Sequence, residues 1–239
     1  MTTQDFLIMA IPAVVALLGG VLAAVWTPNH PARSLIQHFA AGVVLAALAV
    51  ELLPEIEREH APRLVLIACF ALGSLFMYAI KLWTLQMEHR ATLSGAAAGL
   101  GSGLLLATFI DVATDGFIIG AGFAAGGQTG TVLALGLSVE LLFLGLALAS
   151  GATSGRRIIA LSGALGGTVL VFSVLGNALL AGASHAVIGG TLAFSAAALL
   201  YLVTEELLIE AHAVEEQPVS TLVLFAGFLA FWSVQLIGQ

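Results

Sequence analysis

Eight long apolar segments, separated by short polar or Pro/Gly-containing breaks, constrain this chain more than any other feature of its sequence. Each is close to the roughly 20 residues that a helix needs to cross the hydrocarbon core of a bilayer. None alternates apolar and polar residues as the strands of a membrane β-barrel do. We therefore predict an all-α integral membrane protein with eight transmembrane helices, at about 6–26, 35–53, 63–86, 98–125, 131–150, 157–182, 187–209 and 219–237.

Composition supports a single transmembrane domain over residues 1–239. Only 9% of the residues are charged and the mean hydropathy is +1.09, whereas an ordinary soluble domain has about 25% charged residues. The formal net charge of −7 argues against a nucleic-acid partner and leaves the lipid bilayer as the expected surroundings. Cys69 is the single cysteine, so no disulfide or thiolate metal site can form within one chain.

Basic residues near the predicted helix ends indicate an orientation. One side of the predicted bundle has five of them and the other side has two, Arg58 and Arg63. By the positive-inside rule the richer side is cytoplasmic, which places both termini outside. We expect a multi-pass protein of the cell (plasma) membrane. The five basic residues of the richer side are Arg33, Lys81, Arg90, Arg156 and Arg157.

An internal repeat is visible when the chain is aligned with itself at a shift of 155 residues. ELLPE (51–55) then matches ELLIE (206–210), and His30 matches His185. Helices 1–3 and 6–8 would be copies of opposite orientation, as in many secondary transporters. Chance similarity between apolar sequences is the alternative. The predicted arrangement is 3+2+3, with repeat 1 at about 6–86, central helices 4 and 5 at about 98–150, and repeat 2 at about 157–237.

Three acids fall deep inside the two central helices. Asp111 and Asp115 are four residues apart and so share one helix face. The short sequence GGQTG (126–130) predicts a turn between antiparallel helices, and a rise of about 1.5 Å per residue then brings Glu140 to the depth of Asp115. A charge in mid-membrane costs at least about 2.5 to 3.5 kcal/mol. A bound cation or a proton would offset this cost; neutral, hydrogen-bonded packing groups are the alternative.

Further polar residues define a candidate pathway on either side of these acids. Thr108 precedes Asp111 by one turn, and acidic groups gather at the ends of helices 2 and 7. Such clusters would concentrate cations by electrostatic focusing, although solvated interfacial charges are the simpler explanation for those in loops. The pathway candidates at these ends are Glu51, Glu55, Glu205, Glu206, Glu210 and His212.

The motifs of helices 2, 4, 5 and 7 resemble those of the ZIP family, the Zrt- and Irt-like zinc and iron permeases. LLPE (52–55) is similar to that family's helix 2 ending, and EELLIEAH (205–212) to its D-E-L-I-P-E-S-H ending of helix 7. DVATDG (111–116) falls on the family's H-N-x-P-E/D-G, and ELLFLG (140–145) on its H-E-x-P-E-G. The resemblance implies eight helices with outward-facing termini and a metal site between helices 4 and 5.

The same alignment shows where the chain departs from the family. Asp111 and Glu140 replace histidines, whereas Val112, Leu141 and Leu144 stand where the family has ligands of a second metal site. The family's helix 6 carboxylate falls on or near Asn177, which adds that residue to the pathway candidates. The prolines of both motifs are absent.

Asp111, Asp115 and Glu140 would bind a metal through oxygen alone, which suits Mn²⁺, Mg²⁺ or Ca²⁺, with Fe²⁺ a compromise. The resemblance instead implies Zn²⁺, whose sites usually include imidazole or thiolate. The leading hypothesis is a transporter that moves a divalent ion toward the cytoplasm. The ion is the substrate, and no tightly bound cofactor is expected.

Two other functions are open at this point. The alternative is a ZIP-like protein without metal transport, serving as a proton pathway, sensor or assembly subunit. An intramembrane aspartyl protease would need a G-x-G-D motif and aspartates on two facing helices, and the sequence has neither; we therefore expect no enzyme. The oligomeric state is open, with a homodimer as the candidate assembly.

Overall fold

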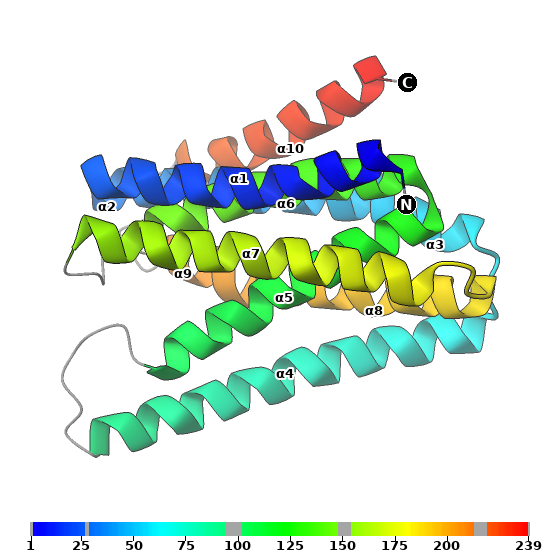
Figure 1. Cartoon of the computed structure of the whole chain (residues 1–239), viewed down its shortest axis with the longest axis horizontal. Coiled ribbons are helices and arrows are strands. Elements are labelled where there is room, and N and C mark those ends of the chain that lie inside the picture. The colour runs from blue at the N-terminus through cyan, green and yellow to red at the C-terminus, as the bar shows by residue number, and fades with distance from the viewer. Residues whose placement is uncertain (1, 27–28, 94–101, 148–153, 213–218, 239) are drawn as a thin grey trace.

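The computed structural model describes residues 2–26, 29–93, 102–147, 154–212 and 219–238 (Figure 1). Within these ranges the chain is helical, and eight helical segments are long and apolar enough to cross a membrane. This confirms the all-α prediction and the pattern of a multi-pass membrane protein. The elements are α1 (Thr3–Val25), α2 (His30–Ala46), η1 (Ala47–Leu52), α3 (Leu53–Arg58), α4 (Arg63–Leu93), α5 (Ser102–Ala125), α6 (Gly127–Ala147), α7 (Gly155–Leu180), α8 (His185–Leu202), η3 (Val203–Leu207), α9 (Leu208–His212) and α10 (Val219–Gly238).

The helices form two groups of four. In the first group, α1 packs extensively on α6 and α7, and α5 packs on α7 and α6. In the second group, α2 packs on α10 and α4 packs on α8. Contacts between the groups, such as α2 with α6 and α5 with α8, are less extensive than those within each closely packed helix pair, and similar in extent to the contacts that join the α2–α10 pair to the α4–α8 pair. The chain is therefore built from an α1, α5, α6, α7 group and an α2, α4, α8, α10 group.

The outermost helices are α4 and α10, which lie at opposite edges of the bundle (Figure 1). Only 11% of the α4 span and 17% of the α10 span is buried, against 67% of the His185–Leu207 span. Apolar side chains that face outward in this way suit contact with lipid. Both termini lie at the same end of the bundle, as an even number of spans requires (Figure 1).

Close backbone contacts at glycine hold each group together. A Cβ atom added to Gly42 on α2 would lie 2.0 Å from the carbonyl oxygen of Leu224 on α10. One added to Gly120 on α5 would lie 2.3 Å from the carbonyl oxygen of Ser173 on α7. No side chain fits in either place, so these helices approach as closely as small-residue packing in membranes permits.

Two of the spans contain a π-helical turn, η1 after α2 and η3 after α8. The backbone N–H of Leu53 donates to the carbonyl of Leu48, and that of Leu208 donates to the carbonyl of Val203, each five residues back. A π turn inserts one extra residue into a helix and is frequent at functional sites. Both π turns contain candidate pathway acids, Glu51 in η1 and the adjacent glutamates in η3.

Two predicted boundaries are wrong in instructive ways. The second span continues through α3 to Arg58 and does not end at residue 53. Pro54 is tolerated because it lies in the first turn of α3, directly after the π turn. The predicted turn at 126–130 reduces to Gly126, because α6 already begins at Gly127.

Candidate metal centre

The structure brings together three carboxylates from the two central helices. Asp111 and Asp115 lie on α5 and Glu140 lies on α6, and one oxygen of each lies within 4.8 Å of the others. The spacing of four residues places both aspartates on the α5 face that meets α6. The predicted proximity of the three side chains is therefore confirmed.

Burial makes this cluster costly in the absence of a positive partner. Asp115 is 2% exposed and Glu140 is 4% exposed. Asp115 Oδ2 and Glu140 Oε2 are buried and have no hydrogen-bond partner among the residues that the structure describes. A buried, unpaired carboxylate oxygen costs far more than a paired one, so a cation or proton at this point would stabilise the protein.

Nearby hydroxyl and apolar groups do not relieve this cost. The Thr114 hydroxyl donates to the carbonyl of Ile110, and the Ser138 hydroxyl donates to the carbonyl of Ala134. Both hydroxyls are thus used within their own helices. Val112 and Leu141, at positions where the resembled family has ligands, are fully buried apolar side chains. They offer no ligand atom to a second ion.

A fourth carboxylate, that of Glu206 in η3, faces the cluster from the other helix group. Glu206 interacts electrostatically with Asp111, Asp115 and Glu140. Glu206 and Asp111 line a cavity of about 90 Å³ beside α4. With Glu140 they also line a second cavity of about 70 Å³. Each cavity is larger than one water molecule, so small ions and water can lie against the carboxylates.

Glu51, the residue that the repeat pairs with Glu206, has a different environment. Its carboxylate is buried and accepts hydrogen bonds from the Thr129 hydroxyl, at 2.8 Å, and from Gln235 Nε2, at 2.6 Å. These donors come from α6 and α10. Glu51 is thus a hydrogen-bonded group outside the three-carboxylate cluster, and sequence reasoning did not identify either donor.

The remaining candidates, at the ends of the second and seventh spans, either form ion pairs or have side chains outside the part of the chain that the structure describes. Glu55 pairs with Arg58 at 3.1 Å, and Glu205 pairs with Lys81. Glu59, also buried, contacts His185 Nδ1 at 2.7 Å. The side chains of the last two candidates lie outside the described residues, namely Glu210 and His212.

Two pathway candidates, one on α5 and one on α7, are not part of the cluster. Thr108 lies on α5 one turn before Asp111, and it is not among the residues that line the two cavities. Asn177 on α7 lies beside Gly120, with its backbone nitrogen 2.7 Å from the position of an added Cβ. Gly120 is more than one turn beyond Asp115, so Asn177 is displaced along the helix from the carboxylates.

Comparison with known proteins adds no assignment, because no family model matches the chain and no curated protein matches its sequence.

Proposed function

We propose that this chain is a ZIP-like transporter that moves a divalent metal ion across the membrane through one carboxylate site. The observation that carries the proposal is the cluster of Asp111, Asp115 and Glu140, which includes two buried oxygen atoms with no hydrogen-bond partner in the described chain. A divalent cation supplies the missing positive charge at a single point between the two helices.

The chemistry of the donors favours a hard or borderline ion. Carboxylate oxygens alone suit Mn²⁺, Mg²⁺ or Ca²⁺, and they accept Fe²⁺. Zn²⁺, which the family resemblance implies, binds more weakly without imidazole or thiolate. We propose Mn²⁺ and Fe²⁺ as the substrates best suited to this site. Zn²⁺ should be tested beside them, because the family resemblance implies it.

The two helix groups support a mechanism in which they move against each other. Asp111, Asp115 and Glu140 belong to the first group, while Glu206 belongs to the second, so relative movement changes the surroundings of the ion. The less extensive contacts between the groups suit such movement. Transporter sites typically lie between elements that move in this way.

Two observations support the proposed inverted repeat. The shift of 155 residues that aligns ELLPE with ELLIE also carries η1 onto residues 202–207, almost coincident with η3. The packing of α2 on α10 corresponds to that of α8 on α4, and the packing of α1 on α6 corresponds to that of α7 on α5. Both correspondences are expected if the two copies are related by a two-fold axis in the membrane plane.

The direction that we propose follows from the charge of the loops. The larger of the two cavities is lined by Lys81 and Thr84, in the last part of the α4 span, which the positive-inside rule places toward the cytoplasm. Both termini are then outside, and a plasma-membrane location is part of the proposal. An ion released from Asp111 into this cavity would leave toward the cytoplasm.

A binding series tests this proposal. Purified protein is heated with Zn²⁺, Fe²⁺, Mn²⁺, Co²⁺, Cd²⁺ or Mg²⁺, and the unfolding midpoint is measured. An ion at about 100 times its Kd should stabilise the protein by about 2.7 kcal/mol. We expect Mn²⁺ and Fe²⁺ to give the largest shifts. The absence of a shift with every ion would contradict the proposal.

The alternative, a ZIP-like protein without metal transport, is favoured by one observation. Val112 and Leu141 are buried where the resembled family has metal ligands, so the described parts of α5 and α6 offer ligands for one site and not for a second. This alternative predicts no metal flux even if an ion binds.

A further inference from the structure

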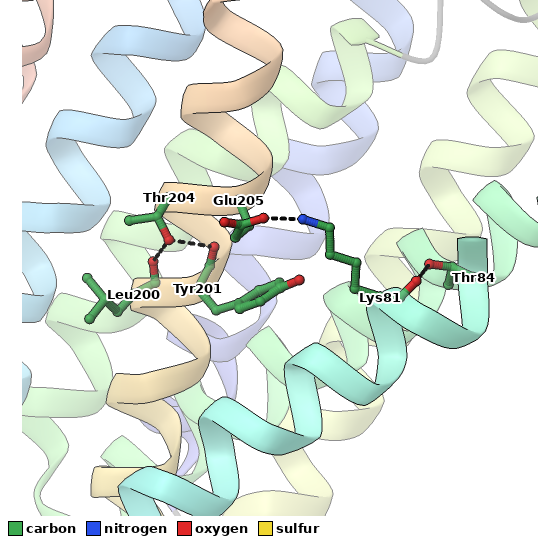
Figure 2. A network of polar contacts seen from close by, with 6 residues as sticks. All are labelled: Lys81, Thr84, Leu200, Tyr201, Thr204 and Glu205. Atoms are coloured by element: carbon green, nitrogen blue, oxygen red, sulfur yellow. Dashed lines mark hydrogen bonds and ion pairs between the residues drawn. The ribbon is translucent and has the colours of Figure 1, made fainter. Parts of the chain in front are cut away.

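Lys81 is a basic side chain within the apolar α4 span, and it points at the acidic end of the neighbouring span. Its ammonium forms an ion pair with Glu205 of η3 (Figure 2). The same Nζ lies 5.9 Å from the centre of the Tyr201 ring. Lys81 and Glu205 side chains are 37% and 39% exposed, so the pair is only partly screened.

This ion pair lies on the same cavity as Asp111 of the proposed site and Glu206, which faces that site. The cavity of about 90 Å³ is lined by Lys81 and Glu205, and also by Asp111 and Glu206. Lys81 and Glu206 interact electrostatically as well. A positive charge on the wall of such a cavity repels any cation bound to the carboxylates opposite.

Two consecutive glutamates of η3, Glu205 and Glu206, both line this cavity. Glu205 forms the ion pair with the Lys81 ammonium, while Glu206 also lines the second cavity together with Asp111. Without Glu205, the long and flexible Lys81 side chain would face Glu206 and Asp111, the other two carboxylates on this cavity.

We propose that Lys81 sets the affinity of the carboxylate site for its divalent ion, and that Glu205 limits this effect by holding the ammonium away from Asp111 and Glu206. The inference rests on the proposed function. Lys81 ligates nothing in this account, and it acts by charge alone. It keeps binding weak enough for the ion to leave into the cavity.

The test measures Mn²⁺ and Zn²⁺ binding to the full-length purified chain by titration calorimetry. Lys81→Gln should lower the Kd by about threefold to tenfold, because a partly screened repulsion is removed. Lys81→Arg keeps the charge and should retain the wild-type Kd. Glu205→Gln should raise the Kd, because the freed ammonium then competes for Glu206 and Asp111.

The double variant Lys81→Gln with Glu205→Gln distinguishes this mechanism from one in which the two charges act on the bound ion independently. If Glu205 acts only by holding Lys81, then Glu205→Gln has no effect on the Kd once Lys81 is glutamine. An equal effect in both backgrounds would overturn the proposal.

Other results distinguish this inference from the function on which it rests. Wild-type binding with an unchanged Kd in Lys81→Gln overturns the inference and leaves the proposed function in place. Lys81→Arg binding as tightly as Lys81→Gln also overturns it, because packing and not charge would then be responsible. If neither ion binds to the wild-type protein, both proposals fail.

Discussion

Replacing Glu140 with glutamine is expected to abolish the stabilisation of this protein by Mn²⁺. The change keeps the size of the side chain and removes the charge that α6 contributes to the three-carboxylate cluster. Loss of a residue that merely orients a metal ligand costs about 10- to 100-fold in affinity, and loss of a ligand should cost at least as much. Asp111→Asn should act in the same direction. The measurement is the Mn²⁺-dependent shift of the unfolding midpoint.

The same substitution should have the opposite effect on the metal-free protein. Glu140 Oε2 is buried without a hydrogen-bond partner in the described residues, and a neutral amide is cheaper to bury than a carboxylate. We therefore expect the metal-free Glu140→Gln protein to be as stable as the wild type, or more stable by about 1 to 3 kcal/mol. Site residues commonly reduce stability in this way for the sake of function.

Glu57→Gln is the matched control for this experiment. Glu57 is an exposed glutamate at the end of the same span as Glu51, outside the cluster. Its replacement should leave the Mn²⁺ shift unchanged. Loss of the shift in Glu57→Gln, or its full retention in both Asp111→Asn and Glu140→Gln, would contradict the assignment of the site.

Gly42→Ala is expected to destabilise the protein by about 3 kcal/mol, at the upper end of the cost of overpacking. The added methyl group would lie 2.0 Å from the Leu224 carbonyl oxygen and 2.9 Å from the Phe228 backbone nitrogen. These are backbone atoms of α10, so the clash is relieved only if α2 and α10 separate. Thermal unfolding of the purified protein measures the loss.

Two further glycines serve as controls for this prediction. Gly227→Ala enters the same interface from α10, 2.2 Å from the Phe39 carbonyl oxygen, and should be equally damaging. Gly167→Ala lies within α7, with nothing within 4 Å of the added atom. It should be neutral, or stabilising by about 0.5 to 1 kcal/mol through helix propensity. Similar midpoints for Gly42→Ala and Gly167→Ala would show that the close packing of α2 and α10 is not required.

The carboxylate cluster was predictable because helix geometry fixes it. A spacing of four residues places Asp111 and Asp115 on one face, and an antiparallel neighbour at a rise of about 1.5 Å per residue carries Glu140 to the same depth. These relations hold within one helix or across one short connection. They need no knowledge of how distant helices are rotated.

The partners of the pathway candidates depend on that rotation and were not predictable. Lys81 meets Glu205 and Gln235 meets Glu51 across 124 and 184 residues of chain. The turn predicted at 126–130 also concealed Thr129, which donates to Glu51 from within α6. Gly130 serves packing at this junction, since an added Cβ would lie 2.7 Å from the Phe123 backbone nitrogen. A glycine required for close packing and one required for a turn look alike in a sequence.

The π turns could not be read from the sequence either. ALAVEL and VTEEL resemble ordinary helical segments, and the extra residue in each is visible only as backbone bonds to the carbonyl five residues back. Both acids of η3, Glu205 and Glu206, nevertheless line one cavity together with Lys81.

Metal flux in proteoliposomes tests the central claim most directly. Purified wild-type protein and Glu140→Gln are reconstituted at equal density, and Mn²⁺ or Zn²⁺ entry is followed with a trapped indicator. The account predicts saturable entry of at least one of these ions with wild-type protein and background entry with Glu140→Gln. Wild-type vesicles that admit no more of either ion than protein-free vesicles would contradict it.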